Sequence, residues 1–304
     1  MTTIPSPTET TPALPLPSAN QPFMHVSAMK AGIIHIPVDL VISGESRVHR
    51  GCPSLSFYLK HSASDRHLIF DLGLRRNFES YPPAVITHYT DLMPCEVPQS
   101  VAESCVKGGL DPATLETIII SHLHFDHIGD HAPFTKASFV LGGRGKVSVA
   151  DGYPGNPASF TLADSTPADR TIFLDDFPTS VGPFPRALDF FGDGSVYVLD
   201  TPGHCLGHIN VLARTSTDGA WIYLGGDVAH DVRLVTESER QIALAAESGA
   251  PYCMHRDPAQ AAVDIGRVRA LVQLPRVELV IAHDWKWYED NIGHAFLPGK
   301  IVPK

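Results

Sequence analysis

The sequence predicts an α/β protein in which two β-sheets face each other beneath outer helices. Short apolar segments typical of strands dominate both halves of the chain, and helix-like segments lie between them. Of the 304 residues, 43% are hydrophobic and 18% are charged, which excludes a disordered chain, a coiled coil and a collagen-like fibre. No internal repeat or linker divides the chain, so we expect one large domain.

The first 22 residues differ in composition from the rest. They contain six prolines and neither lysine nor arginine, whereas a signal peptide has a basic start and a transit peptide has arginines. Proline also keeps such a segment out of helices and sheets. We therefore expect a disordered, Pro/Thr-rich tail over residues 1–22 and one domain over residues 23–304. The alternative is an arm that packs on a partner subunit.

Strands begin the domain. Met29–Ile42 is rich in isoleucine and valine, and Ser54–Lys60 and His67–Asp71 are short β-type segments separated by a polar turn. We expect these three segments to form an antiparallel meander. Ser100–Gly108 is then expected to be a helix that ends at glycine.

The rest of the chain continues the alternation of strands and helices. Thr117–Ile120 reads as an apolar strand buried on both faces. Asp257 is suited to cap a helix with Pro258 at its first position. Four apolar residues would place one face of that helix on a sheet: Ala261, Ile265, Val268 and Val272. The other predicted strands are Ser138–Leu141, Ser195–Leu199, Ile209–Ala213, Trp221–Leu224 and Val277–Ile281.

The charge and the cysteine content of the chain limit which macromolecules it could bind and in which cellular compartment we expect it. Lysine and arginine number 23 against 33 acidic residues, and this formal charge of −10 would repel nucleic acids. No apolar run reaches the length of about 18–20 residues that a membrane span needs. Five cysteines, an odd number without paired spacing, do not form a disulfide scaffold. We therefore expect a cytoplasmic protein with neither nucleic-acid nor membrane partners.

A metal-ligand motif follows the Thr117–Ile120 strand directly. His122, His124, Asp126 and His127 form an HxHxDH motif, and imidazole and carboxylate groups are the ligands that suit zinc and related divalent metals. Alternation along an extended segment puts His122 and His124 on one side, while the following turn directs the other two elsewhere. The motif thus supplies two pairs of ligands and suggests two adjacent metals. The alternative is a group of surface histidines at a strand end.

Three further candidate ligands also lie just past predicted strands. They are His204, Asp227 and His283. A sheet can hold side chains at the ends of its strands accurately, which a metal site requires. Gly203, Gly225 and Gly226 allow the tight turns that bring backbone close to such a site.

Taken in order, the motifs HxHxDH, TPGH, GGD and a late AH resemble those of the metallo-β-lactamase superfamily, from about Met29 to His283. The resemblance implies an αββα sandwich, in which two facing mixed sheets are covered by helices and a dinuclear site lies at one edge. By motif position, His122, His124 and His204 would hold the first metal. Asp126, His127 and His283 would hold the second, and Asp227 would bridge the two.

Differences within the superfamily narrow the chemistry. Class B β-lactamases commonly have a cysteine where this chain has Asp227, and diiron flavoproteins have a glutamate where it has His124. RNA-processing members would be expected to show a basic channel, whereas this chain is acidic. The segments FDLGLRRN and TPGHCLGHINV resemble the quorum-quenching N-acyl-homoserine lactonases, and FDLGLRRNFESYPP is similar to fungal lactonase-like proteins. The alternatives are a glyoxalase II-like thioesterase and a non-catalytic metal-binding protein.

This resemblance implies a dinuclear zinc hydrolase that opens a small-molecule lactone or ester by attack of a metal-bridging hydroxide. Mn²⁺, Co²⁺ and Fe²⁺ are possible substitutes for zinc, and a homodimer is possible. Asp126 would bind one metal and hydrogen-bond the nucleophile, and Asp227 would hold both metals. His230 stands where bacterial lactonases have a substrate-contacting tyrosine, so we expect it to donate a hydrogen bond or proton. The alternative is a histidine that only supports a ligand or lies at the surface.

Other residues near the motifs receive structural interpretations. Asp71 and Asp200 lie at strand ends and are expected to orient ligand histidines. His208 is expected to form structural hydrogen bonds, and Cys205 is not expected to bind metal. The segment Leu234–Arg256 is interpreted either as a lid or as a packed surface helix. Four other residues, expected to lie in loops or in solvent, are Arg75, Arg76, Asp130 and His131.

Overall fold

A computed structural model describes residues 13–245 and 253–304. Across these residues the strands form two six-stranded sheets and a separate three-stranded sheet. The first sheet contains, in spatial order, β1 (Met24–Met29), β4 (Ser56–His61), β5 (His67–Phe70), β7 (Thr117–Ile119), β8 (Ser138–Gly142) and β9 (Thr171–Leu174). The second contains β10 (Thr179–Val181), β11 (Phe184–Asp189), β12 (Val196–Asp200), β13 (Ile209–Arg214), β14 (Trp221–Leu224) and β15 (Val277–Val280). The third contains β3 (His49–Pro53), β2 (Ile33–Pro37) and β6 (Cys95–Glu96).

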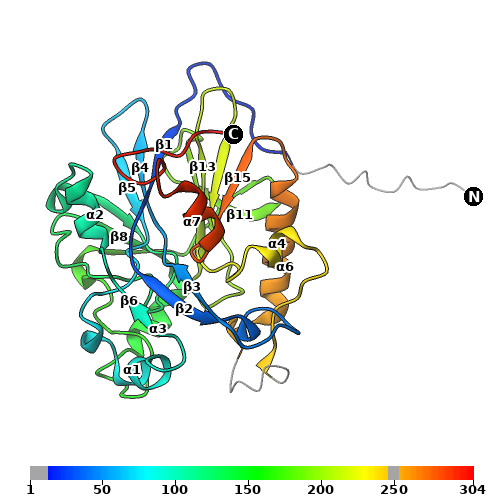
Figure 1. The fold of residues 1–304 in the computed structure, drawn as a ribbon. Helices are drawn as coiled ribbons and strands as arrows, with labels where there is room; N and C mark the ends of the chain where they lie inside the picture. The colour runs from blue at the N-terminus through cyan, green and yellow to red at the C-terminus, as the bar shows by residue number, and fades with distance from the viewer. Residues whose placement is uncertain (1–12, 246–252) are drawn as a thin grey trace, which may run out of the picture.

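Helices cover the outer faces of the two large sheets. Figure 1 shows α1 to α3 on one side of the molecule and α6 on the other, with the sheets between them. The α-helices are α1 (Pro83–Tyr89), α2 (Val101–Lys107), α3 (Lys146–Ala150), α4 (Arg233–Thr236), α6 (Pro258–Val272) and α7 (Trp285–Asn291). The predicted αββα sandwich is confirmed. No helix among the described residues is long and apolar enough to cross a bilayer.

Period-2 alternation builds the core between the two large sheets. Val196 and Val198 of β12 meet Phe57 and Leu59 of β4 in one buried cluster, because alternate side chains of a strand point to the same face. The residues between them on β12 point the other way, and Leu199 joins a second cluster that includes apolar residues of α6. Ile118 and Ile119 of β7 likewise belong to different clusters, so this strand is buried on both faces, as predicted for Thr117–Ile120.

Most predicted elements have the expected bounds to within two residues. The helix predicted after Asp257 is α6, and the Asp257 side chain accepts a hydrogen bond from the Gln260 N–H at 3.0 Å. The predicted Ser100–Gly108 helix is α2, where Ser100 and Glu103 form a reciprocal capping box. The strands of the second sheet from β12 to β15 are also confirmed.

The predicted meander is wrong in its first strand. The partner of β4 is β1, which ends at Met29, whereas Ile33–Pro37 pairs with β3 and β6 in the separate sheet. The chain turns between them at Gly32, which has a φ of +106° and lies so close to Leu74 that a Cβ would be 2.7 Å from it. Only glycine tolerates this turn, so Met29–Ile42 cannot continue as one strand.

Most of residues 13–20 are exposed, but two positions within the predicted tail make specific contacts with the domain. Gln21 is buried and donates to the Asp193 carbonyl at 2.8 Å. The buried Arg214 guanidinium stacks on Trp221 and donates to the Pro15 carbonyl at 2.9 Å, because a buried guanidinium needs an acceptor. Residues 1–12 lie outside the described residues, and the domain boundary stays a prediction.

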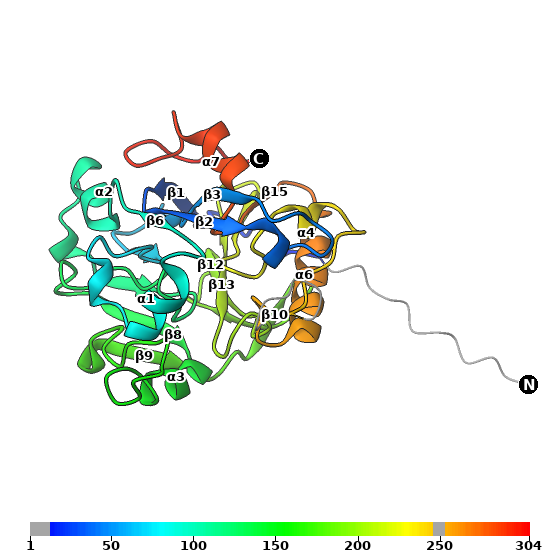
Figure 2. The same cartoon turned by 60° about the horizontal axis from the view of Figure 1, so that its bottom comes forward.

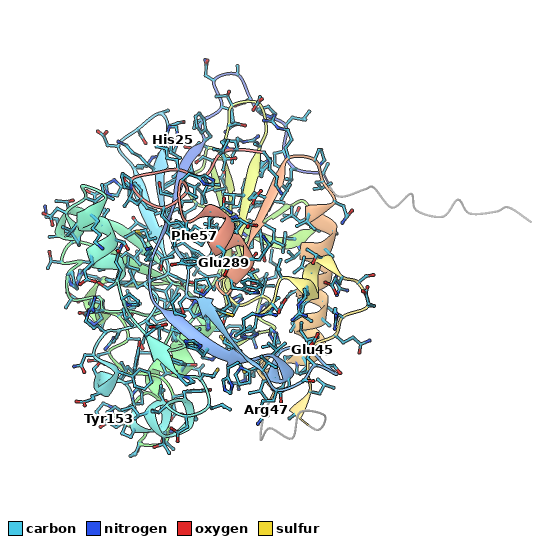
Figure 3. The ribbon with its side chains drawn as sticks, in the orientation of Figure 1. His25, Glu45, Arg47, Phe57, Tyr153 and Glu289 are labelled. Carbon is cyan, nitrogen blue, oxygen red and sulfur yellow. The ribbon has the colours of Figure 1, made fainter. Side chains whose placement is uncertain are left out.

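The three-stranded sheet crosses one end of the sandwich, from the side of α1 towards α4 and α6 (Figures 1 and 2). Its β2–β3 connection carries Glu45, labelled in Figure 3. The Glu45 carboxylate accepts hydrogen bonds from Arg233 at 3.0 Å and from Arg240 at 2.8 Å. These half-buried ion pairs tie the small sheet to the segment that follows Asp227.

Candidate metal centre

The predicted ligands converge from the ends of strands in both large sheets. His122, His124, Asp126 and His127 follow β7 of the first sheet. His204, Asp227 and His283 follow β12, β14 and β15 of the second sheet. Apart from the half-buried His124, all seven are buried, with relative exposures of 5% or less. The structure therefore brings together every residue that the motifs predicted as a ligand.

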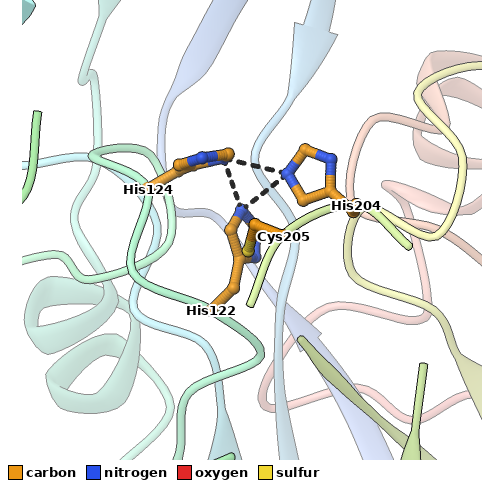
Figure 4. Close-up of side chains that lie close together, drawn as sticks. All are labelled: His122, His124, His204 and Cys205. Atoms are coloured by element: carbon orange, nitrogen blue, oxygen red, sulfur yellow. Dashed lines mark hydrogen bonds between the residues drawn. The ribbon is translucent and has the colours of Figure 1, made fainter. Parts of the chain in front are cut away.

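Three imidazoles form the first ligand group (Figure 4). His124 Nδ1 lies 2.9 Å from His122 Nε2 and 2.9 Å from His204 Nε2, and the two Nε2 atoms are 3.1 Å apart. Each nitrogen presents either a proton or a lone pair, so at least one of the three pairs brings like groups together and is not a hydrogen bond. A cation at their centre resolves this conflict, since zinc binds imidazole nitrogens at about 2.0–2.1 Å.

A second group combines carboxylates and imidazoles. Asp227 Oδ1 lies 3.1 Å from His127 Nε2 and 3.2 Å from His283 Nε2. Asp126 Oδ2 lies 3.6 Å and 3.4 Å from the same two nitrogens. His127 Nε2 and Asp227 Oδ1 are fully buried, and within the described part of the chain they have no hydrogen-bond partner beyond this mutual ion-pair contact, which is costly unless a cation satisfies them.

Asp227 faces both groups at once. Its Oδ1 points to the second group, whereas its Oδ2 lies 3.5 Å from His204 Nε2 and 3.7 Å from His122 Nε2. A carboxylate with one oxygen towards each group is placed to bridge two cations. The donor set therefore fits two adjacent divalent ions with nitrogen and oxygen ligands.

The electrostatics of the two groups differ. Burial, together with the neighbouring imidazoles, lowers the pKa of His122 and of His204 well below the usual histidine value. These rings are therefore neutral, as metal ligands must be. Burial also acts to lower the pKa of His127, but the nearby carboxylates, Asp227 first, outweigh it and raise that pKa. The second group thus favours positive charge at its centre.

Hydrogen bonds to the Nδ1 atoms, on the side away from the ligand group, set the orientation of two histidine rings. Asp71 Oδ2 accepts from His127 Nδ1 at 2.8 Å, and the His283 Nδ1–H donates to the Pro53 carbonyl at 2.9 Å. Such partners set which ring nitrogen faces the metal. Asp71 therefore orients the ring of a predicted ligand, His127, as expected. The prediction for Asp200 is wrong, because its carboxylate accepts from Arg186 on the adjacent β11 at 2.7 Å.

His208 supports the bridging residue. Its Nε2 accepts from the Asp227 backbone N–H at 3.1 Å, and its Nδ1 lies 3.0 Å from the Thr201 carbonyl. These bonds use both ring nitrogens, which agrees with the structural role predicted for His208. Cys205 lies beside the first group, and burial raises the pKa of its thiol. Its sulfur is therefore a poor source of the thiolate that a metal prefers.

A cavity of about 450 Å³ opens onto both ligand groups. His124, Asp126, Asp227 and His283 contribute to its wall, and so does His230. Its apolar wall comes from β2, α1 and neighbouring loops, and includes Ile34, Ile36, Val85, Tyr89, Met93, Leu123, Phe125 and Phe160. The cavity has the size and lining that suit a small molecule with a largely apolar body.

His230 lies beside the bridging carboxylate. Its Nε2 is 3.2 Å from Asp227 Oδ2, and its buried Nδ1 has no hydrogen-bond partner in residues 13–245 and 253–304. His255 lies next to it, with ring centroids 4.8 Å apart. The sequence placed His255 only within the segment Leu234–Arg256, interpreted as a lid or a packed helix, because no spacing rule connects it to the metal motifs. Within Leu234–Arg256, Cys253, Met254 and Arg256 line the cavity, while residues 246–252, with Tyr252, lie outside the described residues.

Comparison with known proteins gives a matching family and relatives. Residues 49–216 match the family described as the metallo-beta-lactamase superfamily. The metallo-hydrolase mfmC of Annulohypoxylon moriforme is 34% identical over 251 residues, which cover 78% of this chain and 65% of that protein. The gamma-lactamase FDB1 of Fusarium pseudograminearum is 34% identical over 203 residues, covering 64% of this chain and 48% of that protein. The chain thus spans between about half and two thirds of the length of these relatives.

Solved structures share the fold. An N-acyl homoserine lactone hydrolase with its product N-hexanoyl-L-homoserine bound at the catalytic metal centre superposes with a TM-score of 0.68. The match covers 91% of this chain and 98% of that one, at 18% sequence identity.

Proposed function

Because the chain belongs to the metallo-beta-lactamase superfamily, we propose that it is a dinuclear zinc hydrolase that opens a lactone or a related ester. The observation that carries this proposal is the position of Asp227, whose two oxygens face two separate ligand groups beside an apolar cavity. The fold shared with an N-acyl homoserine lactone hydrolase supports the lactone as substrate. A more specific version of this proposal is that the substrates are N-acyl homoserine lactones and that the enzyme is quorum-quenching.

The protein's own groups have distinct tasks in this proposal. Zinc held by these residues would supply a hydroxide nucleophile at neutral pH and would polarise a carbonyl oxygen. The seven ligands hold the ions, and Asp227 fixes their separation. Asp126 lines the cavity, where its carboxylate accepts a hydrogen bond from the attacking water. The apolar wall excludes bulk water and holds the body of the substrate against the site.

A γ-lactam is a second candidate substrate. It is favoured by the gamma-lactamase relative, which is 34% identical to this chain. Lactone and lactam rings are similar in shape, so one cavity suits both. They differ in the leaving group, because an amide nitrogen must be protonated before it departs. A lactam therefore depends more strongly on a proton donor such as His230.

Hydrolysis of a matched substrate panel tests the proposed function. We expect purified protein to open an N-acyl homoserine lactone or a simple γ-lactone, to lose this activity on chelation, and to regain it with zinc, manganese or cobalt. Asp227→Asn is the matched inactive variant. Faster hydrolysis of a thioester would support a glyoxalase II-like enzyme instead. Retention of metal without hydrolysis of any ester, lactam or thioester would support a non-catalytic metal-binding protein.

Substitution of His230 tests its catalytic role. We expect His230→Ala to keep its metal and to lower turnover about 10²–10⁴-fold, the usual effect of removing a general acid or base. His230→Tyr should restore part of the turnover on a homoserine lactone, because a phenol donates a similar hydrogen bond. Loss of metal with unchanged turnover per bound metal would show instead that His230 only supports the ligands.

The cellular compartment of the protein is also part of this proposal. The five cysteines, all within described residues, are free thiols, which fits a reducing compartment such as the cytoplasm. A homodimer also stays a prediction.

A further inference from the structure

His255 lies beside His204 and His230, in a segment that is hydrogen-bonded to the loop containing His204. The backbone N–H of the next residue, Arg256, donates to the His204 carbonyl at 2.8 Å, and the Asp257 N–H donates to Gly203 at 3.1 Å. The His255 ring lies 5.3 Å from the His204 ring and 4.8 Å from the His230 ring, in edge-to-face contact with both. Its position is therefore fixed relative to both histidines.

The ring nitrogens of His255 are buried and unsatisfied. The residue is 1% exposed, and neither Nδ1 nor Nε2 has a hydrogen-bond partner among the described residues. Among the described residues, the Nδ1 atoms of His204 and His230 are also buried without hydrogen-bond partners. Each of the three histidines offers one ring nitrogen within 4.8 Å of the others, which provides the two to four polar partners that a single buried water needs.

A third metal ion is a poorer explanation of this histidine cluster. His204, His230 and His255 offer ligand atoms within 4.8 Å of one another, but none of these side chains brings negative charge. His204 already belongs to the first ligand group. A third dication beside the two proposed ions would be opposed by strong charge repulsion, with only Asp126 and Asp227 as anionic ligands.

We propose that His255 is a positioning residue for His230. The edge of its ring packs against His230, and one buried water joins the two imidazoles by hydrogen bonds. These contacts hold the His230 ring with Nε2 beside Asp227 Oδ2 and at the cavity wall. His255 itself does not line the cavity, so it acts on the reaction only through His230. This role rests on the proposed function, in which His230 is the proton donor.

A double-mutant cycle tests the coupling. We expect His255→Phe, which keeps a flat ring but removes both nitrogens, to lower kcat about 10–100-fold with unchanged metal content and little change in KM. In the His230→Ala background the same substitution should have no further effect. His255→Gln should restore part of the loss, because an amide offers a donor and an acceptor. The matched control is His61→Phe, a buried histidine of β4 that contacts Asp193 at 3.0 Å.

Several results would overturn the role of His255. An unchanged kcat in His255→Phe, or losses that add in the double variant, would show that it does not act through His230. Loss of one metal equivalent would make it a ligand. Nitrogen NMR of the His230 side chain gives a readout without substrate: its resonances should shift in His255→Phe and not in His61→Phe. If no lactone is hydrolysed but these resonances shift, the proposed function is wrong, whereas the contact between His255 and His230 is supported.

Discussion

Asp71 illustrates how a residue outside the ligand set shapes the site. It ends β5 with a φ of +62°, a conformation that aspartate and asparagine tolerate better than most residues. Its carboxylate accepts from the Ser121 N–H at 2.6 Å, from the Ser121 hydroxyl at 2.7 Å and from His127 Nδ1 at 2.8 Å. One side chain thus anchors the start of the HxHxDH loop and selects the His127 nitrogen that faces the second ligand group.

Asp71→Asn tests this anchor with little change of shape. In either orientation the amide nitrogen would face a group that is itself a donor, the Ser121 N–H or the His127 Nδ1–H, so we expect metal affinity to fall about 10–100-fold, mainly at the second ligand group. Asp200→Asn is the matched control, because Asp200 pairs with Arg186 and no ligand. Metal titration with a competing chelator measures both. Equal affinities for wild type and Asp71→Asn would contradict the anchoring role.

Single residues were predictable where they belong to a motif. The seven candidate ligands have characteristic spacings and lie past apolar strands, so the sequence identified the residues that the structure brings together. Asp200 also follows an apolar strand, but its carboxylate is directed to the neighbouring strand, and only the pairing of β11 with β12 shows this. His255 belongs to no motif and reaches the site through long-range packing.

At the scale of elements, the junction between the His204 loop and α6 controls the first ligand group. A Cβ on Gly203 would lie 2.3 Å from the Ala261 backbone nitrogen. The Gly203 N–H also donates to Asp264 of α6 at 3.0 Å. Helix and loop are therefore in direct backbone contact, and His204 is the residue that follows.

Two glycine substitutions separate this contact from helix propensity. Gly203→Ala should destabilise the protein by about 1–3 kcal/mol, the usual cost of overpacking, and should weaken the first metal site. A Cβ on Gly266, which lies within α6, would meet nothing within 4 Å. Gly266→Ala should therefore stabilise the protein by about 0.5–1 kcal/mol. Denaturant unfolding with metal analysis measures both effects. A Gly203→Ala protein with wild-type stability and metal content would exclude the proposed close contact.

Several elements carried no clear sequence signal. β3 and β6 belong to the small sheet, and β6 has only two residues, too few for a periodic pattern. Yet this sheet places Ile34 and Ile36 at the cavity. The shape of the substrate pocket therefore depends on elements that local pattern does not reveal.

For the whole molecule, the sandwich could be predicted because its strands are strongly apolar and its two cores follow the alternation of side chains. The separation of β2 from the first sheet could not be predicted, because an Ile- and Val-rich strand suits either sheet. Only the turn at Gly32 shows that β2 leaves the first sheet. The packing of residues 13–22 was also hidden, because their composition is that of a solvated tail. Their contacts depend on Asp193, which is 172 positions from Gln21, and on Arg214, which is 199 positions from Pro15.

The central claim is that the fold brings two metal ions together across Asp227. Metal analysis of the purified, zinc-loaded chain tests it most directly. We expect close to two ions per chain, and close to one in His204→Ala and in His283→Ala, since each variant removes a ligand from a different group. A stoichiometry that never exceeds one ion in the wild-type protein, even after zinc loading, would contradict the dinuclear site.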